Sequence, residues 1–440
     1  MSTTVRTPQS VAEVVGQTLA ATGVTDAFGV IGSGNLIVTN ALCSQGARFH
    51  AARREDGAIC MADGYARVSG QTGICSLHQG PGLTNAVTGL TEAVKSRTPL
   101  LVLAGEAPAA APTSNFHIDQ PALAASVGAA SDRIKSPATA ADDAQRAYQR
   151  AVIERRPVLL NVPIDIQPRP PEALAPTHPP LPALPTPDPS AQAVAAVADL
   201  LQSAERLLIL AGRGAVLSDA RDELERLGAI TGALMATSAV ANGLFAGLPY
   251  ALGISGGFAS PVATALLPQA DVVLVLGASV NHWTTRHGRL IGDGAKVAQV
   301  DIEARAFGLN HRLDLTMLGD ASAGARLLAD ELERRGHRTT GWRTEEMARE
   351  IAAHTWPSEP YRDAGTDEWI DPRTLSIALE ARLPGEKAVA VDSGHFLGYP
   401  AMFLSVPDAR AWVFPNGFQS VGLGLGCAIG AAIARPERPT

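Results

Sequence analysis

Residues 53–67 read RREDGAICMADGYAR, and after a short apolar run residues 77–86 read LHQGPGLTNA. The first stretch predicts a helix whose opening turn carries two acids, Glu55 and Asp56, where the helix dipole favours negative charge. The second stretch is a glycine-rich turn between a buried strand and another helix. Ligands of α/β proteins bind at such turns, outside the carboxyl ends of the strands. The two stretches therefore predict an α/β fold with a ligand site beside them.

Strand and helix patterns alternate on both sides of these stretches. Apolar runs predict buried strands at Gly73–Leu77, Leu100–Gly105, Val158–Ile164, Leu207–Ala211, Asp271–Gly277, Lys296–Ile302 and Ala388–Asp392. Amphipathic or alanine-rich stretches predict helices at Asp56–Val68, Thr84–Lys95, Asp142–Ile153, Ala191–Gln202 and Ala321–Arg335. Strands separated by helices of this length favour parallel sheets covered on both faces.

Composition and charge restrict the class of protein. A chain of 440 residues exceeds one hydrophobic core, so two or three domains are expected. The net charge of −7 comes without a basic stripe, which argues against a nucleic-acid partner. Four cysteines without a CxxC pair argue against a zinc site and fit a reducing cytosol. No apolar stretch is long enough to span a bilayer, so a soluble, cytoplasmic protein without membrane contact is expected.

The order of three motifs resembles the pyrimidine-binding domain of thiamine-diphosphate-dependent enzymes such as acetolactate synthases and benzoylformate decarboxylases. The motifs are Phe28 to Ser33, Glu55 to Arg67, and Gly80 to Asn85. The resemblance extends through Leu210–Ala215 and Val391–His395 to the segment after Asn416. It implies three α/β domains, each a parallel sheet flanked by helices, with the third domain incomplete.

Composition places the expected boundaries of these domains. Proline-rich residues 168–189 read as an extended linker, because proline fixes its own backbone and donates no amide. We therefore expect a pyrimidine-binding domain at 1–167 and a central Rossmann-like domain at 190–336. A second linker at 337–370 precedes a partial diphosphate-binding domain at 371–440, which at this size is too small to bury its own sheet.

The resemblance implies a thiamine-diphosphate-dependent decarboxylase or carboligase acting on a 2-oxo acid, as acetolactate synthases do. Glu55 is the implied activating carboxylate, because a carboxyl group bonded to N1′ of the aminopyrimidine favours the tautomer that deprotonates C2. Asp56 follows immediately and points elsewhere on a helix. By position, Ile31, Gly32, Pro81 and Asn85 line the aminopyrimidine.

Polar side chains near the same motifs are candidates for substrate contact. Ser33 and His78 fall where benzoylformate decarboxylases keep a serine and a histidine facing the substrate. An alternative for His78 is a strand-end histidine bonded to backbone. His117 falls where acetolactate synthases place an active-site glutamine, and Gln79 is a further polar candidate.

A second set of candidates lies near the end of the sequence. Gly394, His395 and Phe396 follow a predicted strand, and a glycine there lets backbone amides approach a phosphate. Phe418, Gln419 and Ser420 precede a glycine-rich helix at Gly422–Ala434. By alignment Val421 lies under the thiazolium, where acetolactate synthases usually have methionine and benzoylformate decarboxylases leucine.

The family holds Mg2+ through a Gly-Asp-Gly motif and a later asparagine, which are expected beyond Thr440, so no metal ligand is predicted among these residues. Gly292-Asp293-Gly294 reads as a turn instead. FAD is less favoured as a cofactor, because Gly212–Ala215 is not a GxGxxG motif. His282, Arg286 and His287 either bind an anionic nucleotide or form a solvated basic turn.

The resemblance also implies a homodimer or homotetramer with the cofactor at the subunit interface. Other functions stay open. The chain could be a non-catalytic, truncated paralogue with a scaffolding or dimerisation role, a lyase of the 2-hydroxyacyl-CoA type, or a flavin- or nucleotide-binding module. The donor and acceptor substrates, and the balance between decarboxylation and ligation, are not predicted.

Overall fold

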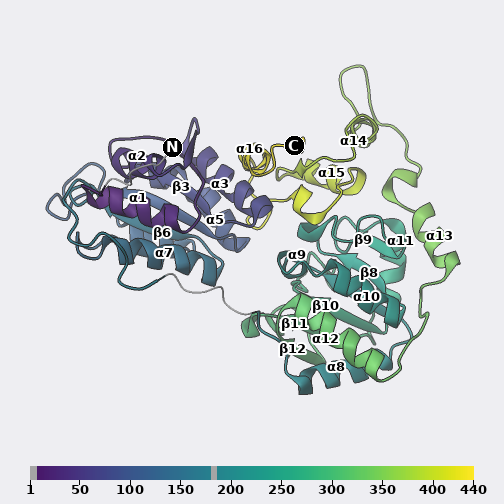
Figure 1. Ribbon diagram of the computed structural model, residues 1–440. Helices are drawn as coiled ribbons and strands as arrows, with labels where there is room; N and C mark the ends of the chain where they lie inside the picture. Colours follow the sequence, from purple (N-terminus) through teal and green to yellow (C-terminus); the bar gives the residue numbers. More distant parts are fainter. Residues whose placement is uncertain (1–6, 180–185) are drawn as a thin grey trace. The chain divides into compact units, whose positions relative to one another are not determined.

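The computed structural model describes residues 7–179 and 186–440 (Figure 1). Residues 180–185 of the predicted proline-rich linker, and residues 1–6, lie outside the described part. The chain forms two compact units. The first comprises Met1–Ala183, Ala390–Gly394 and Val413–Thr440, and the second comprises Leu184–Val389 and His395–Trp412.

The first unit is built on a six-stranded parallel sheet in the order β2-β1-β3-β4-β6-β5. Its strands are β1 (Asp26–Gly29), β2 (Arg48–Ala51), β3 (Gly73–Leu77), β4 (Leu100–Glu106), β5 (Ala130–Arg133) and β6 (Val158–Pro163). The chain moves from β1 to β2 on one side and to β3 on the other. The order therefore reverses between β1 and β3, where open α/β sheets bind ligands.

Helices cover both faces of this sheet. They are α1 (Val11–Ala21), α2 (Leu36–Ser44), α3 (Glu55–Ser69), α4 (Pro81–Asn85), α5 (Val87–Lys95), α6 (Gln120–Ser126), α7 (Ala140–Glu154) and α16 (Gly424–Ala434). Alternate residues of one strand enter opposite cores: Leu100 and Val102 pack with α3 and α5, whereas Leu101 and Leu103 pack with α1 and α7. Burial on both faces explains why these strands are continuous apolar runs.

The local sequence decides where α3 begins and ends. Arg54 is extended, with φ −147° and ψ 159°, and the acids Glu55 and Asp56 occupy the first turn. Gly70 ends the helix in the left-handed region at φ 74°, which glycine adopts without strain. The start of α3 thus places Glu55 directly after β2, at the carboxyl edge of the sheet.

The second unit contains another six-stranded parallel sheet, in the order β12-β11-β10-β7-β8-β9. Its strands are β7 (Leu207–Ala211), β8 (Leu234–Thr237), β9 (Ala251–Ile254), β10 (Val272–Leu276), β11 (Lys296–Asp301) and β12 (Leu315–Leu318). Its helices are α8 (Ala191–Gln202), α9 (Arg213–Leu217), α10 (Arg221–Thr231), α11 (Pro261–Leu266), α12 (Ala321–Arg334), α13 (Glu345–Ala353), α14 (Pro372–Glu380) and α15 (Gly398–Phe403).

Short elements complete the chain. The 3-10 helices are η1 (Ala239–Ala241), η2 (Leu267–Gln269), η3 (Ala304–Ala306), η4 (Trp356–Ser358), η5 (His395–Leu397) and η6 (Ala409–Ala411). A third, two-stranded sheet pairs β13 (Val389–Ala390) with β14 (Trp412–Val413). None of the helices in the described part combines the length and apolar composition that a bilayer crossing needs.

The predicted α/β class with parallel sheets is confirmed, and most predicted elements occur within a residue or two of their expected ends. One helix prediction is wrong: Thr84–Lys95 is not a single helix, because α4 and α5 meet at Ala86. The helix α13 also lies within residues 337–370, which were expected to connect two domains.

Candidate functional site

The loops that follow β1 and β3 meet at the reversal point of the first sheet. Ser33 follows β1 and His78 follows β3, and the Ser33 hydroxyl lies 3.3 Å from Nε2 of His78. Nδ1 of His78 lies 2.8 Å from the carbonyl oxygen of Gln79, so a proton on Nδ1 leaves Nε2 as the acceptor for Ser33. His78 therefore has the backbone bond of the alternative interpretation and also faces Ser33.

Glu55 lies at the same edge and is held by Asn85 at the end of α4. The Asn85 side-chain amide donates a hydrogen bond of 2.9 Å to Oε2 of Glu55. A Cβ added to Gly82 would lie 3.6 Å from Oε1 of Glu55 and 3.1 Å from Cβ of His78. Gly82 thus leaves open the space between Glu55 and His78, and the second carboxylate oxygen faces that space.

Two further candidates border this group. Gly32 lies against the imidazole ring of His78, where any Cβ would collide with Cδ2. Ile31, the residue before it, is 42% exposed and presents an apolar surface beside this group. The structure therefore brings together seven of the predicted residues: Ile31, Gly32, Ser33, Glu55, His78, Pro81 and Asn85.

His117 and Gln79 are placed differently. The ring of Phe116 contacts His78 edge-on, with centroids 4.9 Å apart, and the next side chain, His117, is exposed. Gln79 is only 2% exposed, and its carboxamide fills the space beside Gly34 and Gly105. Gln79 is therefore a packing residue beneath the site, not a side chain that faces a ligand.

Two buried amides that organise the site were not singled out from the sequence. Asn35 is fully buried, accepts a bond from the amide of Gly32 and donates to the carbonyl of Val30 and the hydroxyl of Ser76. Gln120 accepts a bond from the amide of Gly80. Asn35 directly precedes α2 and Gln120 opens α6, and an amide side chain at a helix start is too common to single out either residue.

The second set of candidates is divided between the units. Gly394 belongs to the first unit, whereas His395 and Phe396 open η5 of the second and are exposed. Gly394 has φ 114°, which explains a glycine at this turn. Nearby, the amide of Gly422 donates to both carboxylate oxygens of Asp392, at 2.9 and 3.0 Å. This amide is therefore already hydrogen-bonded within the protein.

Glu92 on α5 anchors the segment that contains Phe418, Gln419, Ser420 and Val421. Its carboxylate accepts bonds from the amides of Gly417 and Phe418, at 3.1 and 2.7 Å. Gln419 follows in the left-handed region, at φ 61°, and Val421 is 66% exposed. These residues form an exposed turn before α16.

Glu92 is 1% exposed and belongs to a buried charge network. Arg67 pairs with Glu92 at 2.9 Å and with Asp63 at 2.8 Å. Burial alone raises the pKa of Glu92, but Arg67, the Ser96 hydroxyl and the two amides outweigh it and hold this pKa below its usual value. Burial lowers the pKa of Arg67, but the two carboxylates raise it above its usual value overall. Both groups therefore remain charged at neutral pH.

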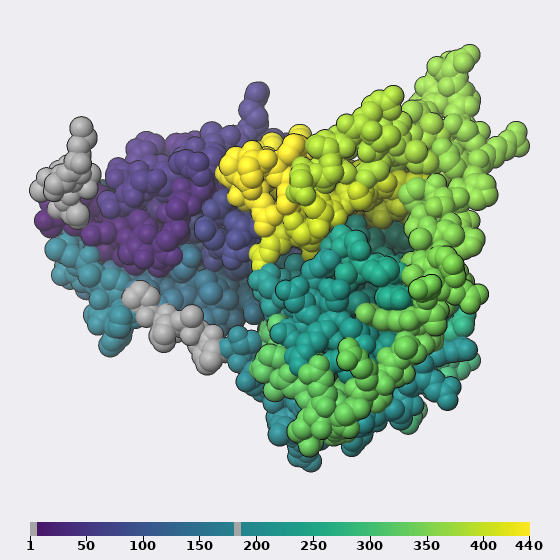
Figure 2. All heavy atoms as spheres, turned by 45° about the vertical axis from the view of Figure 1, so that its right-hand side comes forward, coloured from purple at the N-terminus to yellow at the C-terminus, as the bar shows by residue number. Residues whose placement is uncertain are grey.

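Helix α16 packs against α3, and the yellow C-terminal part of the chain lies next to the purple N-terminal part (Figures 1 and 2). The neighbours of Gly426, which are Gly57 and Cys60, and those of Gly430, which are Met61 and Tyr65, show that the two helices run in the same direction. A Cβ on Gly426 would lie 3.1 Å from the carbonyl of Gly57, and one on Gly430 would collide with the carbonyl of Met61. Glycines thus allow the two backbones to approach closely. The parallel direction places the first turn of α16 near Gly57 and Cys60, toward the Glu55 end of α3, whereas Gly417 and Phe418 lie beside Glu92 and Ser96, near the end of α5.

Ligands for a metal ion do not converge in the described residues. No group of three or more His, Cys, Asp or Glu side chains is close enough together to hold one. Gly292-Asp293-Gly294 forms a turn before β11, as predicted.

Comparisons with known proteins agree with this arrangement. Residues 9–123 match the family of thiamine pyrophosphate enzymes, N-terminal TPP binding domain, and residues 194–328 match the central domain of the same enzymes. A sulfoacetaldehyde acetyltransferase of Rhodobacter capsulatus is 32% identical over 95% of the chain and 74% of its own length. A probable 2-ketoarginine decarboxylase of Pseudomonas aeruginosa is 30% identical over 96% and 74%. A probable acetolactate synthase large subunit of Methanocaldococcus jannaschii is 28% identical over 97% and 73%.

Proposed function

The chain belongs to the thiamine pyrophosphate enzyme family, and on that premise we propose that it uses thiamine diphosphate to break or form a carbon–carbon bond beside the carbonyl group of a 2-oxo acid. Glu55 is the activating carboxylate in this proposal. The observation that carries it is the bond from Asn85 to Oε2 of Glu55, which directs the other carboxylate oxygen toward the space above Gly82.

The residues present fit an aminopyrimidine ring. A side chain at Gly82 would fill the space in front of Glu55, and the exposed Ile31 offers an apolar surface of the kind that a flat ring packs against. Oε1 of Glu55 can share a proton with a ring nitrogen while Asn85 holds Oε2. The fit explains glycine at position 82 and asparagine at position 85 together.

When bound, thiamine diphosphate supplies a nucleophilic carbon and an electron sink for the bond that breaks. The chain supplies the positions and the protons. Glu55 holds a proton at the ring nitrogen, and Asn85 keeps the carboxylate from rotating. His78, with Nε2 directed at Ser33, can orient a substrate carboxylate through the Ser33 hydroxyl and exchange a proton with the reacting oxygen. Mg2+ belongs to the same proposal through the family; among the described residues no group of three or more His, Cys, Asp or Glu side chains gathers to hold it.

The names of the relatives support the reaction class. A decarboxylase supports the cleavage of a carboxylated substrate, and an acetyltransferase and a synthase support transfer of the remaining fragment to an acceptor. A homodimer or homotetramer with the cofactor at the subunit interface, and a cytoplasmic location, belong to the same proposal. Both follow from the family and from the composition of the chain.

Calorimetric titration with thiamine diphosphate and Mg2+, followed by CO2 release from pyruvate and from benzoylformate, tests this function. Glu55→Gln should lower the rate of CO2 release by about 100-fold or more, the usual contribution of a positioned proton donor or acceptor. Asp56→Asn is the matched control, because Asp56 is half exposed, lies 3.6 Å from Arg54 and bonds its neighbour Gly57. Absence of cofactor binding by the wild-type chain would favour the scaffolding alternative.

A further inference from the structure

Gln120 lies beneath the Gly80 turn and connects three strand ends. Its side chain is 2% exposed. Oε1 accepts a bond of 2.9 Å from the amide of Gly80, which follows β3. Nε2 donates to the carbonyl of Gly105 on β4, at 3.1 Å, and to Oδ1 of Asn161 on β6, at 2.7 Å. One carboxamide therefore joins the carboxyl ends of three neighbouring strands.

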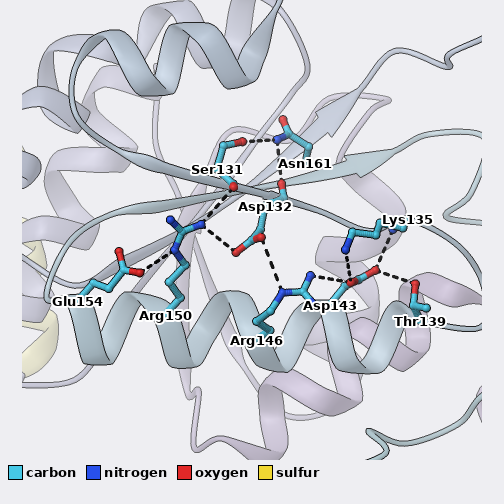
Figure 3. Close-up of polar contacts among 9 residues, drawn as sticks. All are labelled: Ser131, Asp132, Lys135, Thr139, Asp143, Arg146, Arg150, Glu154 and Asn161. Carbon is cyan, nitrogen blue, oxygen red and sulfur yellow. Dashed lines mark hydrogen bonds and ion pairs between the residues drawn. The ribbon is translucent and has the colours of Figure 1, made fainter.

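Asn161 fixes the orientation of that carboxamide. It is 1% exposed, and its Nδ2 donates to the hydroxyl of Ser131 and the carbonyl of Asp132 (Figure 3). With both of its amide protons used on β5, Asn161 can present only its oxygen to Gln120. Gln120 must then donate through Nε2, and its oxygen is left for Gly80. The donor and the acceptor of each hydrogen bond between Asn161, Gln120 and Gly80 are therefore determined.

The Gly80 turn needs such a support. Gly80 has φ 62° and ψ −104°, and a Cβ there would lie 2.5 Å from the carbonyl of Phe116. The turn is thus pressed against the Phe116 loop, whose ring contacts His78. Directly after it comes α4, which carries Gly82 and Asn85. Any shift of Gly80 displaces the side chain that holds Glu55.

We propose that Gln120 is a positioning residue that holds the Gly80 turn, and through it Asn85 and Glu55, in place for the cofactor. The effect on cofactor binding rests on the proposed function, but the positioning of the Gly80 turn is a property of the protein without ligand. Gln120 contacts neither Glu55 nor the open space above Gly82; it acts through the amide of Gly80.

Two variants separate the elements of the network. Gln120→Met keeps the length of the side chain and removes all three bonds. Gln120→Glu keeps the acceptor for Gly80 and, while protonated, one donor. Once ionised, this carboxylate faces the oxygens of Gly105 and Asn161, so burial and these oxygens raise its pKa above the usual value of about 4.3. The defect of Gln120→Glu should therefore be small at low pH and grow as the pH rises through that raised pKa.

The matched control is Gln299 on β11 of the second unit, which is 3% exposed and donates one bond of 3.3 Å to the carbonyl of Ala278. Amide hydrogen exchange of residues 78–86 is measured without ligand, followed by the Kd of thiamine diphosphate with Mg2+. Gln120→Met should speed exchange and weaken binding by about tenfold each, the effect expected from leaving the Gly80 amide unpaired. Gln120→Glu should lie closer to wild type than Gln120→Met does at pH 5 and should approach Gln120→Met at pH 8.

Unchanged exchange of residues 78–86 in both Gln120 variants would overturn the proposal. It would also be overturned if the Gln120 variants lost global stability as Gln299→Met does and the exchange of Gln120→Glu did not depend on pH. If wild type binds no thiamine diphosphate, the proposed function fails, and the exchange experiment still decides whether Gln120 holds the turn. If wild type binds and Gln120→Met binds equally well, the positioning role fails while the proposed function stands.

Discussion

The side-chain amide of Asn85 lies 2.9 Å from Oε2 of Glu55, and the two residues are 30 positions apart in the chain. One lies at the end of α4 and the other at the start of α3, so the bond forms only when the loops after β2 and β3 lie side by side. It leaves one oxygen of Glu55 available to a ligand. The geometry of the Glu55 site therefore depends on a residue that takes no part in proton transfer itself.

Asn85→Ala should lower kcat/KM by about tenfold, because a bond to a charged group contributes about 1.5–3 kcal/mol and part of it is replaced by water. The Kd of thiamine diphosphate should rise by a similar factor. Steady-state kinetics and calorimetry measure the two effects. Thr84→Ala is a suitable control, because the neighbouring hydroxyl donates to the carbonyl of Pro81 within α4. Equal kinetics in Asn85→Ala and wild type would show that Glu55 needs no such support.

Gly82→Ala should weaken cofactor binding without unfolding the chain. Its added methyl group would lie 3.1 Å from Cβ of His78 and 3.6 Å from Oε1 of Glu55, in the space proposed for the ring. Alanine suits the helical backbone of α4, so a loss of affinity would come from occupied space. Gly57→Ala on α3 meets only Ala52, at 4.0 Å, and should leave affinity unchanged. Calorimetry measures the cofactor affinity of both variants. Tight binding by Gly82→Ala would show that the aminopyrimidine ring does not lie in the space above Gly82.

Ser33→Ala and His78→Ala should reduce turnover while leaving the Kd of the cofactor within about twofold of wild type. The reason is that the Ser33–His78 pair faces the substrate in the proposed mechanism, while Glu55 and Asn85 hold the ring. We expect a loss in kcat of about 100-fold for His78→Ala and less for Ser33→Ala. Weakened cofactor binding in both variants would instead show that Ser33 and His78 help to bind the aminopyrimidine ring of the cofactor.

Glu92 should make stability depend on pH at the acid end. The pKa of this group is lowered in the folded chain, so its contribution is present above the unfolded pKa of about 4.3 and is lost as pH falls through the lower folded pKa. Glu92→Gln breaks a buried pair with Arg67 and should cost about 3 kcal/mol at pH 7. Urea unfolding at pH 7 and at pH 3 measures the free energy of unfolding, and the difference between variant and wild type should shrink at pH 3.

Glu154→Gln serves as the surface comparison for that experiment. Its pair with Arg150 has both side chains about one-third exposed, and such pairs contribute less than about 1 kcal/mol. The assignment of the buried network as the anchor of residues 417 and 418 would be contradicted by either of two results. One is a loss of about 3 kcal/mol in the free energy of unfolding of Glu154→Gln, and the other is no loss in that of Glu92→Gln.

Much of the first unit could be predicted from local sequence. The strand β3 was predicted with its observed ends, since a parallel strand buried on both faces must be a continuous apolar run. The start of α3 was predicted within one residue, because two adjacent acids are typical of the first turn of a helix. The break between α4 and α5 was not predicted, since Ala86 is a good helix former and nothing local ends the helix there.

The supports of the site depend on long-range contacts. Gln120 and Glu92 have ordinary neighbours in sequence, and their importance appears only when Gly80, Asn161 and the segment at residue 417 lie next to them. Gln79 shows the reverse case. It stands between His78 and Gly80 in the sequence, but the turn after β3 buries its side chain against Gly34 and Gly105.

The sequence by itself determined the parallel α/β class, the place of Glu55 at a helix start and the glycine-rich turn after β3, because backbone preferences and apolar periodicity act over short distances. Only the tertiary structure decided that Asn85 reaches Glu55, that Ser33 faces His78, and that buried amides and one buried carboxylate hold the surrounding loops. These bonds join residues tens to hundreds of positions apart. The buried polar groups among them, such as Gln120 and Glu92, had to be paired once packing removed them from water, and the pairing depends on which strands become neighbours.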